Sequence, residues 1–298
     1  MKRNSLMRRL VPALFLAVSG SASYAGEWSG YVGAEARYFL SDPLLDEQSE
    51  HNASLASEFE YYHDFDDGDQ RIAFTGFARV DSEDSQRSHA DIRELYWWKN
   101  FNGVEVYAGI RKVFWGVTES VHLVDVLNQS DVVENLDGED KLGQPMIEFT
   151  SARDWGTVSA YILPYFRERE FPGEKGRLRA AAPILEEANY QSDDEEQHVD
   201  FAFRWSHYID IWDFGISHFS GTNRTPYFTP EFSGEEFIGL RANYQQIDQT
   251  GIDVQATIEA WLLKLEAISI DEQDFGRNTA LATGVEYSFY SIGGTAAD

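Results

Sequence analysis

The chain has 298 residues, of which 51 are acidic and 24 are basic, giving a formal net charge of −27. This charge argues against a nucleic-acid partner, because the phosphate backbone requires a basic surface. Hydrophobic residues form 43% of the chain and aromatic residues 14%, which excludes a disordered acidic protein.

The amino-terminal residues have the pattern of a secretory signal peptide. Four of them are basic: Lys2, Arg3, Arg8 and Arg9. An apolar run follows at 10–18, too short to cross a membrane as a helix, and the small residues Ser23 and Ala25 occupy the −3 and −1 positions of a cleavage site. We therefore expect residues 1–25 to be removed on export, leaving 26–298 as the mature domain. The alternative is an amphipathic first helix of a cytosolic domain.

Apolar and polar residues then alternate along one segment after another. For example, Val106 and Ala108 share one side of their segment while Glu105 and Tyr107 share the other. A period of two is typical of strands with one apolar and one polar face. We predict twelve strands, most of about the 9–11 residues needed to cross a bilayer at a tilt. They lie roughly at 27–39, 53–64, 70–81, 90–99, 103–114, 146–152, 156–163, 198–207, 212–220, 249–258, 261–270 and 280–290.

The connections between these strands alternate between long and short. The long ones are 40–52, 82–89, 115–145, 164–197, 221–248 and 271–279. The short ones are 65–69, 100–102, 152–155, 208–211 and 259–260. Long outer loops and short periplasmic turns are typical of bacterial outer-membrane barrels, whereas a soluble sandwich has no reason to sort its loops in this way.

The tryptophans support the same prediction independently. Most lie at the strand ends that carry the short turns: Trp28, Trp98, Trp155, Trp205, Trp212 and Trp261, with Trp97 just inside. Trp115 falls at the other end. Aromatic rings at one level of a membrane protein form an interfacial girdle. We therefore predict an all-β fold, a transmembrane antiparallel up-and-down β-barrel in the bacterial outer membrane.

Three features depart from a simple barrel pattern. Arg93 and Glu94 are adjacent, so either one of them faces lipid or a β-bulge intervenes. The stretch 237–244 can form a strand within its long loop or fold inward. Gly293 and Gly294 indicate another turn, and we expect further strands beyond the end of this chain. The alternative is a twelve-stranded barrel with a short polar tail.

Residues 107–120, with the sequence YAGIRKVFWGVTES, resemble a family of proteobacterial outer-membrane barrels, mostly uncharacterised and related in style to alginate-export and other substrate-specific porins. In that family a strand ending in Gly-x-Arg-x runs into a Trp-Gly-x-x-Glu/Asp segment and then a long loop. Residues 220–226 and 244–253 are similar to the family as well. The resemblance implies a barrel and an exported location, and it identifies no substrate. Members of the family tend to be longer than this chain.

Three arginines on neighbouring strands are expected at nearly one height if Arg93 faces inward: Arg79, Arg93 and Arg111. The long loop that follows them is acidic and contains Asp131, Glu134, Asp137, Glu139 and Asp140. If loop 115–145 folds into the lumen, these acids face the arginines, and such rings of charge set ion and solute selectivity. The alternative is that the arginines pair with wall residues and fill a polar interior. The wall acids nearest to them are Asp81, Asp91 and Glu105.

We expect a porin-like channel for passive or substrate-selective passage of small solutes, in contact with outer-membrane lipid and lipopolysaccharide. The seven histidines are scattered without a nucleophile–base motif, and the acids at 131–140 do not match an EF-hand, so no enzyme activity, cofactor or metal is expected. Two alternatives stay open. One is a structural or adhesin-type barrel. The other is a barrel hydrolase with a rim site near His51, His89 or His198.

Overall fold

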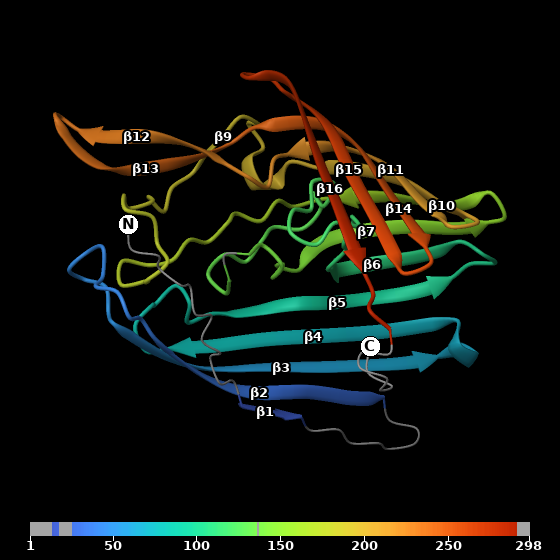
Figure 1. Ribbon diagram of the computed structural model, residues 1–298, viewed down its shortest axis with the longest axis horizontal. Helices are drawn as coiled ribbons and strands as arrows, with labels where there is room; N and C mark the ends of the chain where they lie inside the picture. Colours follow the sequence, from blue (N-terminus) through green and yellow to red (C-terminus); the bar gives the residue numbers. More distant parts are fainter. Residues whose placement is uncertain (1–13, 18–25, 136, 291–298) are drawn as a thin grey trace.

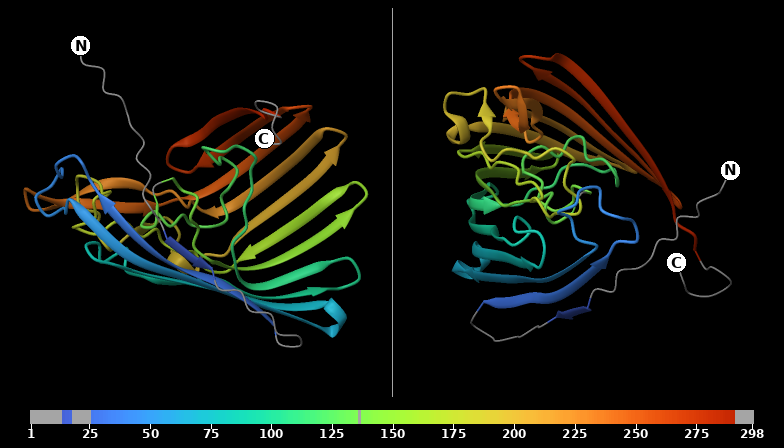
Figure 2. Two further views of the ribbon diagram at one scale, coloured as in Figure 1. Left: turned by 60° about the horizontal axis from the view of Figure 1, so that its bottom comes forward. Right: turned by 90° about the vertical axis from the view of Figure 1, so that its left-hand side faces the viewer.

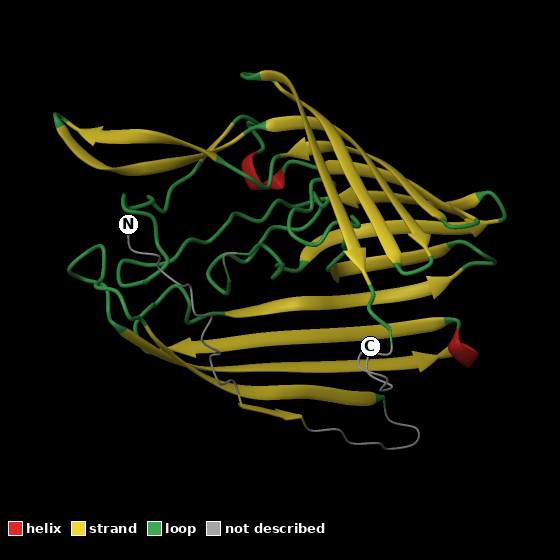
Figure 3. Cartoon of the chain, in the orientation of Figure 1, coloured by secondary structure: helices red, strands yellow, loops and turns green. Residues whose placement is uncertain are grey.

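The computed structural model describes residues 14–17, 26–135 and 137–290. In these ranges the chain consists almost entirely of β-strands and the loops between them (Figure 3). The two helical segments described are single 3-10 turns, η1 (Asp66–Gly68) and η2 (Glu195–Gln197). No helix within the described ranges is long and apolar enough to span a membrane.

Thirteen strands of the described chain form one antiparallel sheet in chain order (Figure 1). They are β1 (Leu14–Ala17), β2 (Glu27–Tyr38), β3 (His51–Phe65), β4 (Gln70–Asp81), β5 (Ala90–Asn100), β6 (Glu105–Arg111), β7 (Gln144–Arg153), β8 (Gly156–Leu163), β10 (Asp200–Ile209), β11 (Trp212–Thr222), β14 (Gln246–Ile258), β15 (Trp261–Glu272) and β16 (Gly276–Tyr287). All twelve predicted strands are present among these. β1 falls within the expected signal peptide, whose remaining residues lie outside the described ones, as does the expected turn at Gly293 and Gly294.

The long connection before β14 contains a strand. This is one of the two alternatives expected for residues 237–244. β13 (Glu236–Tyr244) pairs with β12 (Tyr227–Ser233) in a hairpin and runs parallel to β9 (Asn189–Tyr190), giving a second, three-stranded sheet. Figure 1 shows this hairpin extending beyond the end of the main sheet. It is therefore an addition to the loops at that end and not part of the wall.

The main sheet curves around a central space but does not close. The strand order runs from β1 to β16, and within the described residues β16 pairs with β15 alone. Figure 2 shows the opening between β16 and the strands at the amino-terminal edge. The structure therefore shows the predicted antiparallel up-and-down sheet, but not its closure into a barrel. Closure depends on the number of strands, their tilt and their stagger together. The alternation of apolar and polar residues within single strands gives no information on these three quantities.

The two faces of the sheet are the reverse of those in a water-soluble protein. The outer face carries exposed apolar side chains, including Val32, Leu55, Val80, Phe201, Ile252 and Leu281. The inner face carries buried polar and charged side chains, including Arg93, Glu148, Asp253, Lys264 and Glu266. Val80 is 69% exposed, whereas Glu266 is 0% exposed. Soluble domains rarely bury charges or expose large apolar patches, so the predicted alternation of faces is present with its polar side inward.

A β-bulge in β5 accounts for the adjacent charges noted in the sequence. The β4 partners of Ile92 and Glu94 are consecutive residues, so Arg93 between them has no partner and is the extra residue. Ile92 and Leu95 are exposed on the outer face, whereas Arg93 is buried inside. The bulge therefore lets Arg93 and Glu94 both lie on the inner side.

Candidate pore constriction

Residues 112–143 connect β6 to β7 and are termed the inner loop. The described part of this loop, 112–135 and 137–143, runs back inside the curve of the sheet (Figure 2). An apolar core fixes one side of this loop. Trp115 and Leu127 are buried against Tyr161 of β8 and Phe219 of β11, and the Trp115 and Tyr161 rings meet edge-on with their centroids 5.6 Å apart. This side of the inner loop thus packs against the strands from β7 to β14.

Glu266 of β15 holds the start of the inner loop. Its buried carboxylate accepts hydrogen bonds from the N–H of Val117 at 2.8 Å, the N–H and hydroxyl of Thr118 at 2.9 and 2.7 Å, and the N–H of Val124 at 3.2 Å. Four donors satisfy the charge of a buried carboxylate and offset its desolvation. Sequence analysis did not single out Glu266, although it is a charged inward position of a predicted strand.

Arg79 of β4 joins the wall of the sheet to the inner loop. Its Nη2 lies 2.7 Å from Glu134 Oε2, and its Nε donates to Glu134 Oε1 at 2.8 Å. Its Nη1 lies 3.3 Å from Glu35 of β2 and donates to the Ser54 hydroxyl at 2.7 Å. Arg79 therefore takes part in both expected arrangements, pairing with a loop acid and with a wall acid.

Arg93 makes the corresponding contacts from β5. Its Nη2 lies 2.5 Å from Asp131 of the inner loop, and its Nη1 donates to the Lys141 carbonyl at 2.9 Å. Its wall partner is Asp91, at 3.3 Å. The guanidinium also lies over the Phe77 ring, 4.8 Å from the centroid. These contacts depend on the bulge, because the bulge turns Arg93 toward the loop.

Arg111 does not join the other two arginines. It pairs with Glu148 of the adjacent β7 and lies over the Tyr107 ring, 3.8 Å from the centroid. Within the described residues it has no ion pair with an acid of the inner loop. Its wall pairing was one of the expected alternatives, although Glu148 was not among the partners named for it.

The remaining predicted acids of the inner loop take separate positions. Glu139 lies 2.8 Å from His122 Nε2, and Asp140 accepts a hydrogen bond from Asn135 Nδ2 at 2.6 Å. Asp137 is exposed and accepts the Glu139 N–H at 3.2 Å. Glu139 and Asp140 line the cavity described below, and Asp137 does not.

His89, just before β5, is an ionisable group beside the two acids of the inner loop that pair with the wall arginines. Its Nε2 lies 3.2 Å from Asp131 and 3.9 Å from Glu134, and its Nδ1 lies 3.2 Å from the Arg87 carbonyl. Although burial opposes protonation, the hydrogen bond to Asp131 and the charge of that residue raise the pKa of His89. In turn, although burial disfavours its charge, His89 and Arg93 lower the pKa of Asp131.

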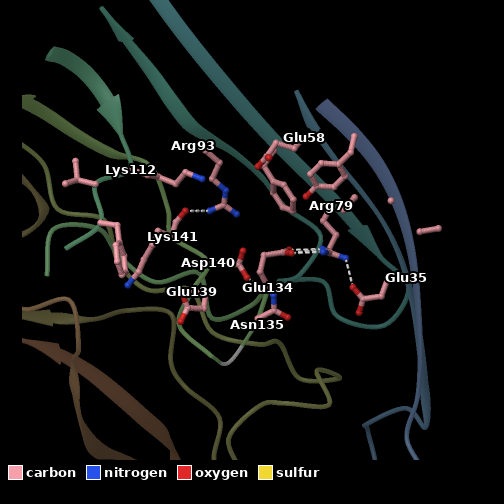
Figure 4. Close-up of a pocket in the computed structure, with 17 residues that line it drawn as sticks. Glu35, Glu58, Arg79, Arg93, Lys112, Glu134, Asn135, Glu139, Asp140 and Lys141 are labelled. Atoms are coloured by element: carbon pink, nitrogen blue, oxygen red, sulfur yellow. Dashed lines mark hydrogen bonds and ion pairs between the residues drawn. The ribbon is translucent and has the colours of Figure 1, made fainter. Parts of the chain in front are cut away.

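A cavity of about 460 Å³ lies between the inner loop and strands β2 to β5 (Figure 4). Its charged lining comes from both sides: Glu35, Glu58, Arg79, Arg93, Lys112, Glu134, Glu139, Asp140 and Lys141. Aromatic rings of Phe77 and Phe114 complete it. Of the nine charged residues, sequence analysis had not proposed Glu35, Glu58, Lys112 and Lys141. Alternation places Glu35 and Glu58 inward on predicted strands. Lys112 lies within the predicted strand 103–114 on the apolar side of Val106 and Ala108, so alternation places it outward, whereas β6 ends at Arg111 and Lys112 belongs to the inner loop.

In comparisons with protein-family models and with curated proteins, nothing matched the chain. Among the described residues, no group of three or more His, Asp or Glu side chains is arranged to hold a metal ion. The site described above consists of ion pairs and hydrogen bonds around a cavity.

Proposed function

We propose that this chain is a bacterial outer-membrane β-barrel protein that acts as a porin-like channel for small solutes. The observation that carries the proposal is the reversed polarity of the sheet, with apolar side chains such as Val80 outside and charged ones such as Glu266 inside. Apolar surface in contact with water costs about 25 cal/mol per Å², and a lipid environment removes that cost. Antiparallel pairing supplies the backbone hydrogen bonds that such an environment demands between neighbouring strands, and closure of the sheet in the membrane would supply those of its two edges.

The proposed passage follows the cavity between the inner loop and β2 to β5. The other side of the inner loop packs against the sheet in the apolar core around Trp115 and Leu127, so solutes have more room beside Arg79 and Arg93. Charges gathered in a narrow lumen with low-dielectric walls act strongly on passing solutes. The resemblance of residues 107–120 to substrate-specific porins agrees with this proposal.

The test is to express the full chain in a Gram-negative host, locate it by membrane fractionation and measure the conductance of the purified protein in planar bilayers. We expect recovery in the outer membrane, a mature amino terminus at Gly26 by mass spectrometry, and discrete conductance steps. A soluble product that keeps residues 1–25 contradicts the membrane assignment. Folded protein in the outer membrane that conducts no ions rejects the channel and favours the structural barrel.

A further inference from the structure

Two charged side chains in the cavity differ from the rest of its lining. Within the described residues, Glu58 of β3 and Lys112 at the start of the inner loop form no side-chain hydrogen bond or ion pair with each other or with any neighbour, although the charge of Lys112 acts electrostatically on Glu58. The other charged residues of the lining are all bonded: Glu35, Arg79, Arg93, Glu134, Glu139, Asp140 and Lys141. Figure 4 shows the two unbonded residues on the wall side and the loop side of one cavity.

The chemistry of this pair defines what complements it. Glu58 is half-buried and has lost part of its hydration, whereas Lys112 is exposed at the cavity. Each of them gains from an opposite charge brought to it. A simple cation satisfies Glu58 and leaves Lys112 unpaired, and a simple anion does the reverse. A solute that carries both an ammonium and a carboxylate group satisfies both residues without adding net charge.

The rest of the cavity suits the same kind of solute. Its volume of about 460 Å³ falls within the range of about 300–1,000 Å³ usual for small-molecule sites. Phe77, Val113 and Phe114 supply apolar surface beside the charges. Because the neighbouring arginines are already paired with Glu134 and Asp131, their charges compete less for the solute than that of Lys112.

We propose that this cavity binds a small zwitterionic solute of the amino-acid type, its ammonium at Glu58 and its carboxylate at Lys112. The inference rests on the proposed channel for its biological meaning, since the solute then passes through the site. The binding itself does not depend on conductance. Glu58 and Lys112 are the residues that determine specificity.

Binding is measured by calorimetry on the full-length protein in detergent, with L-alanine as the probe. Lactate lacks the ammonium group of alanine, and ethylammonium lacks the carboxylate. We expect alanine to bind at least about tenfold more tightly than either, the effect of one lost contact to a charged group. Glu58→Gln and Lys112→Met should each weaken alanine binding by a similar factor. The control is Glu60→Gln, on the same face of β3 but outside the cavity and bonded to Ser29, which should leave binding unchanged.

Charge reversal separates a paired site from a general effect of charge. Glu58→Lys and Lys112→Glu should each abolish alanine binding, and the double reversal should restore part of it. Equal affinity for alanine, lactate and ethylammonium overturns the proposal, as does wild-type binding by the Glu58→Gln and Lys112→Met variants. Conductance in potassium chloride is recorded on the same samples. Conductance without alanine binding rejects the site alone, and alanine binding without conductance rejects the channel alone.

Discussion

At the scale of single residues, Gly116 and Glu266 show how the wall positions the inner loop. Gly116 has a φ of +123°, which favours glycine, and a Cβ built on it would lie 2.6 Å from Glu266 Oε1. Only a residue without a side chain allows the loop backbone to approach the carboxylate this closely. The Trp-Gly pair that carries the family resemblance thus has a physical role here. It brings the N–H groups of Val117 and Thr118 within reach of a buried charge.

The first prediction is that Glu266→Ala releases the inner loop. The substitution leaves the N–H groups of Val117, Thr118 and Val124 without their acceptor, at a cost of about 1–3 kcal/mol for each group that stays buried. The Thr118 hydroxyl keeps the Val121 carbonyl as an acceptor. We expect faster protease cleavage within 117–124 and a stability loss on the order of 3 kcal/mol, both measured in detergent. Glu60→Ala, whose carboxylate is exposed and bonded to Ser29, is the matched control. If both variants resist cleavage as the wild type does, Glu266 is not the anchor of the loop.

The second prediction concerns pH and His89. Because the pKa of His89 is raised, protonated His89 stabilises the contacts of the inner loop with the wall. This stabilisation is complete below the ordinary histidine pKa of about 6.5 and is lost as the pH rises through the raised pKa. Because the pKa of Asp131 is lowered, its contribution is present above about 3.9 and is lost as the pH falls through the lowered value. The inner loop should therefore be held most firmly between about pH 4 and pH 6.5.

Protease cleavage of the inner loop, followed from pH 5 to pH 9, measures this effect. We expect cleavage to increase on the alkaline side, by an amount equivalent to about 1 kcal/mol. His89→Gln should flatten that side of the profile. His51→Gln serves as the control, since among the described residues the His51 side chain makes no hydrogen bond to the inner loop. A profile that His89→Gln leaves unchanged assigns the pH dependence to another group.

At the scale of elements, the strands could be predicted because alternation and turn length are local properties of the chain. All twelve expected strands are present, and of the two alternatives that the adjacency of Arg93 and Glu94 left open, the bulge is the one the structure contains. The partners of the arginines were harder to predict, because they depend on the path of a loop that has no period. Arg111 stays with Glu148 on the next strand, while Arg93 reaches across to Asp131. Closure of the sheet could not be predicted either, because it depends on how all the strands are arranged and not on the sequence of any one strand.

The third prediction tests which face of a strand meets lipid. On β14, Val254 lies on the side of the exposed Ile252, and Gln255 lies on the side of the buried Asp253. Val254→Arg should cost about 2–4 kcal/mol in a bilayer, the usual penalty for a cationic side chain on the lipid-facing surface of a barrel. Gln255→Arg should cost much less. The measurement is denaturant unfolding in lipid vesicles, and equal costs at both positions point to a sheet whose outer face meets water.

At the scale of the whole molecule, the inner loop packs against the sheet on one side and borders a cavity on the other. The apolar core around Trp115 and Phe219 fills one side, and the charged cavity lies on the other. The charge balance along the proposed passage is therefore set by a few groups and not by the net charge of −27. Arg79 and Arg93 neutralise acids of both the loop and the wall there.

The fourth prediction is that Arg79→Gln combined with Arg93→Gln makes the channel more selective for cations. Removing both guanidinium groups leaves Glu134, Asp131 and the wall acid Glu35 less neutralised beside the passage. Charges focused by a narrow lumen change local ion concentrations by a factor of about 10 or more. The cation-to-anion permeability ratio, obtained from reversal potentials in a salt gradient, should rise by roughly that factor. Arg79→Lys with Arg93→Lys should keep the original ratio, because it restores the charges.

Arg111→Gln is the matched control, since it removes an arginine from the same wall that is paired with Glu148 and lies outside the cavity. If selectivity is set in the cavity, this variant keeps the wild-type reversal potential. If instead it shifts the potential as much as the double variant does, selectivity follows the total charge of the lumen. If neither variant shifts it, ions do not pass beside Arg79 and Arg93, and the passage must lie elsewhere in the molecule.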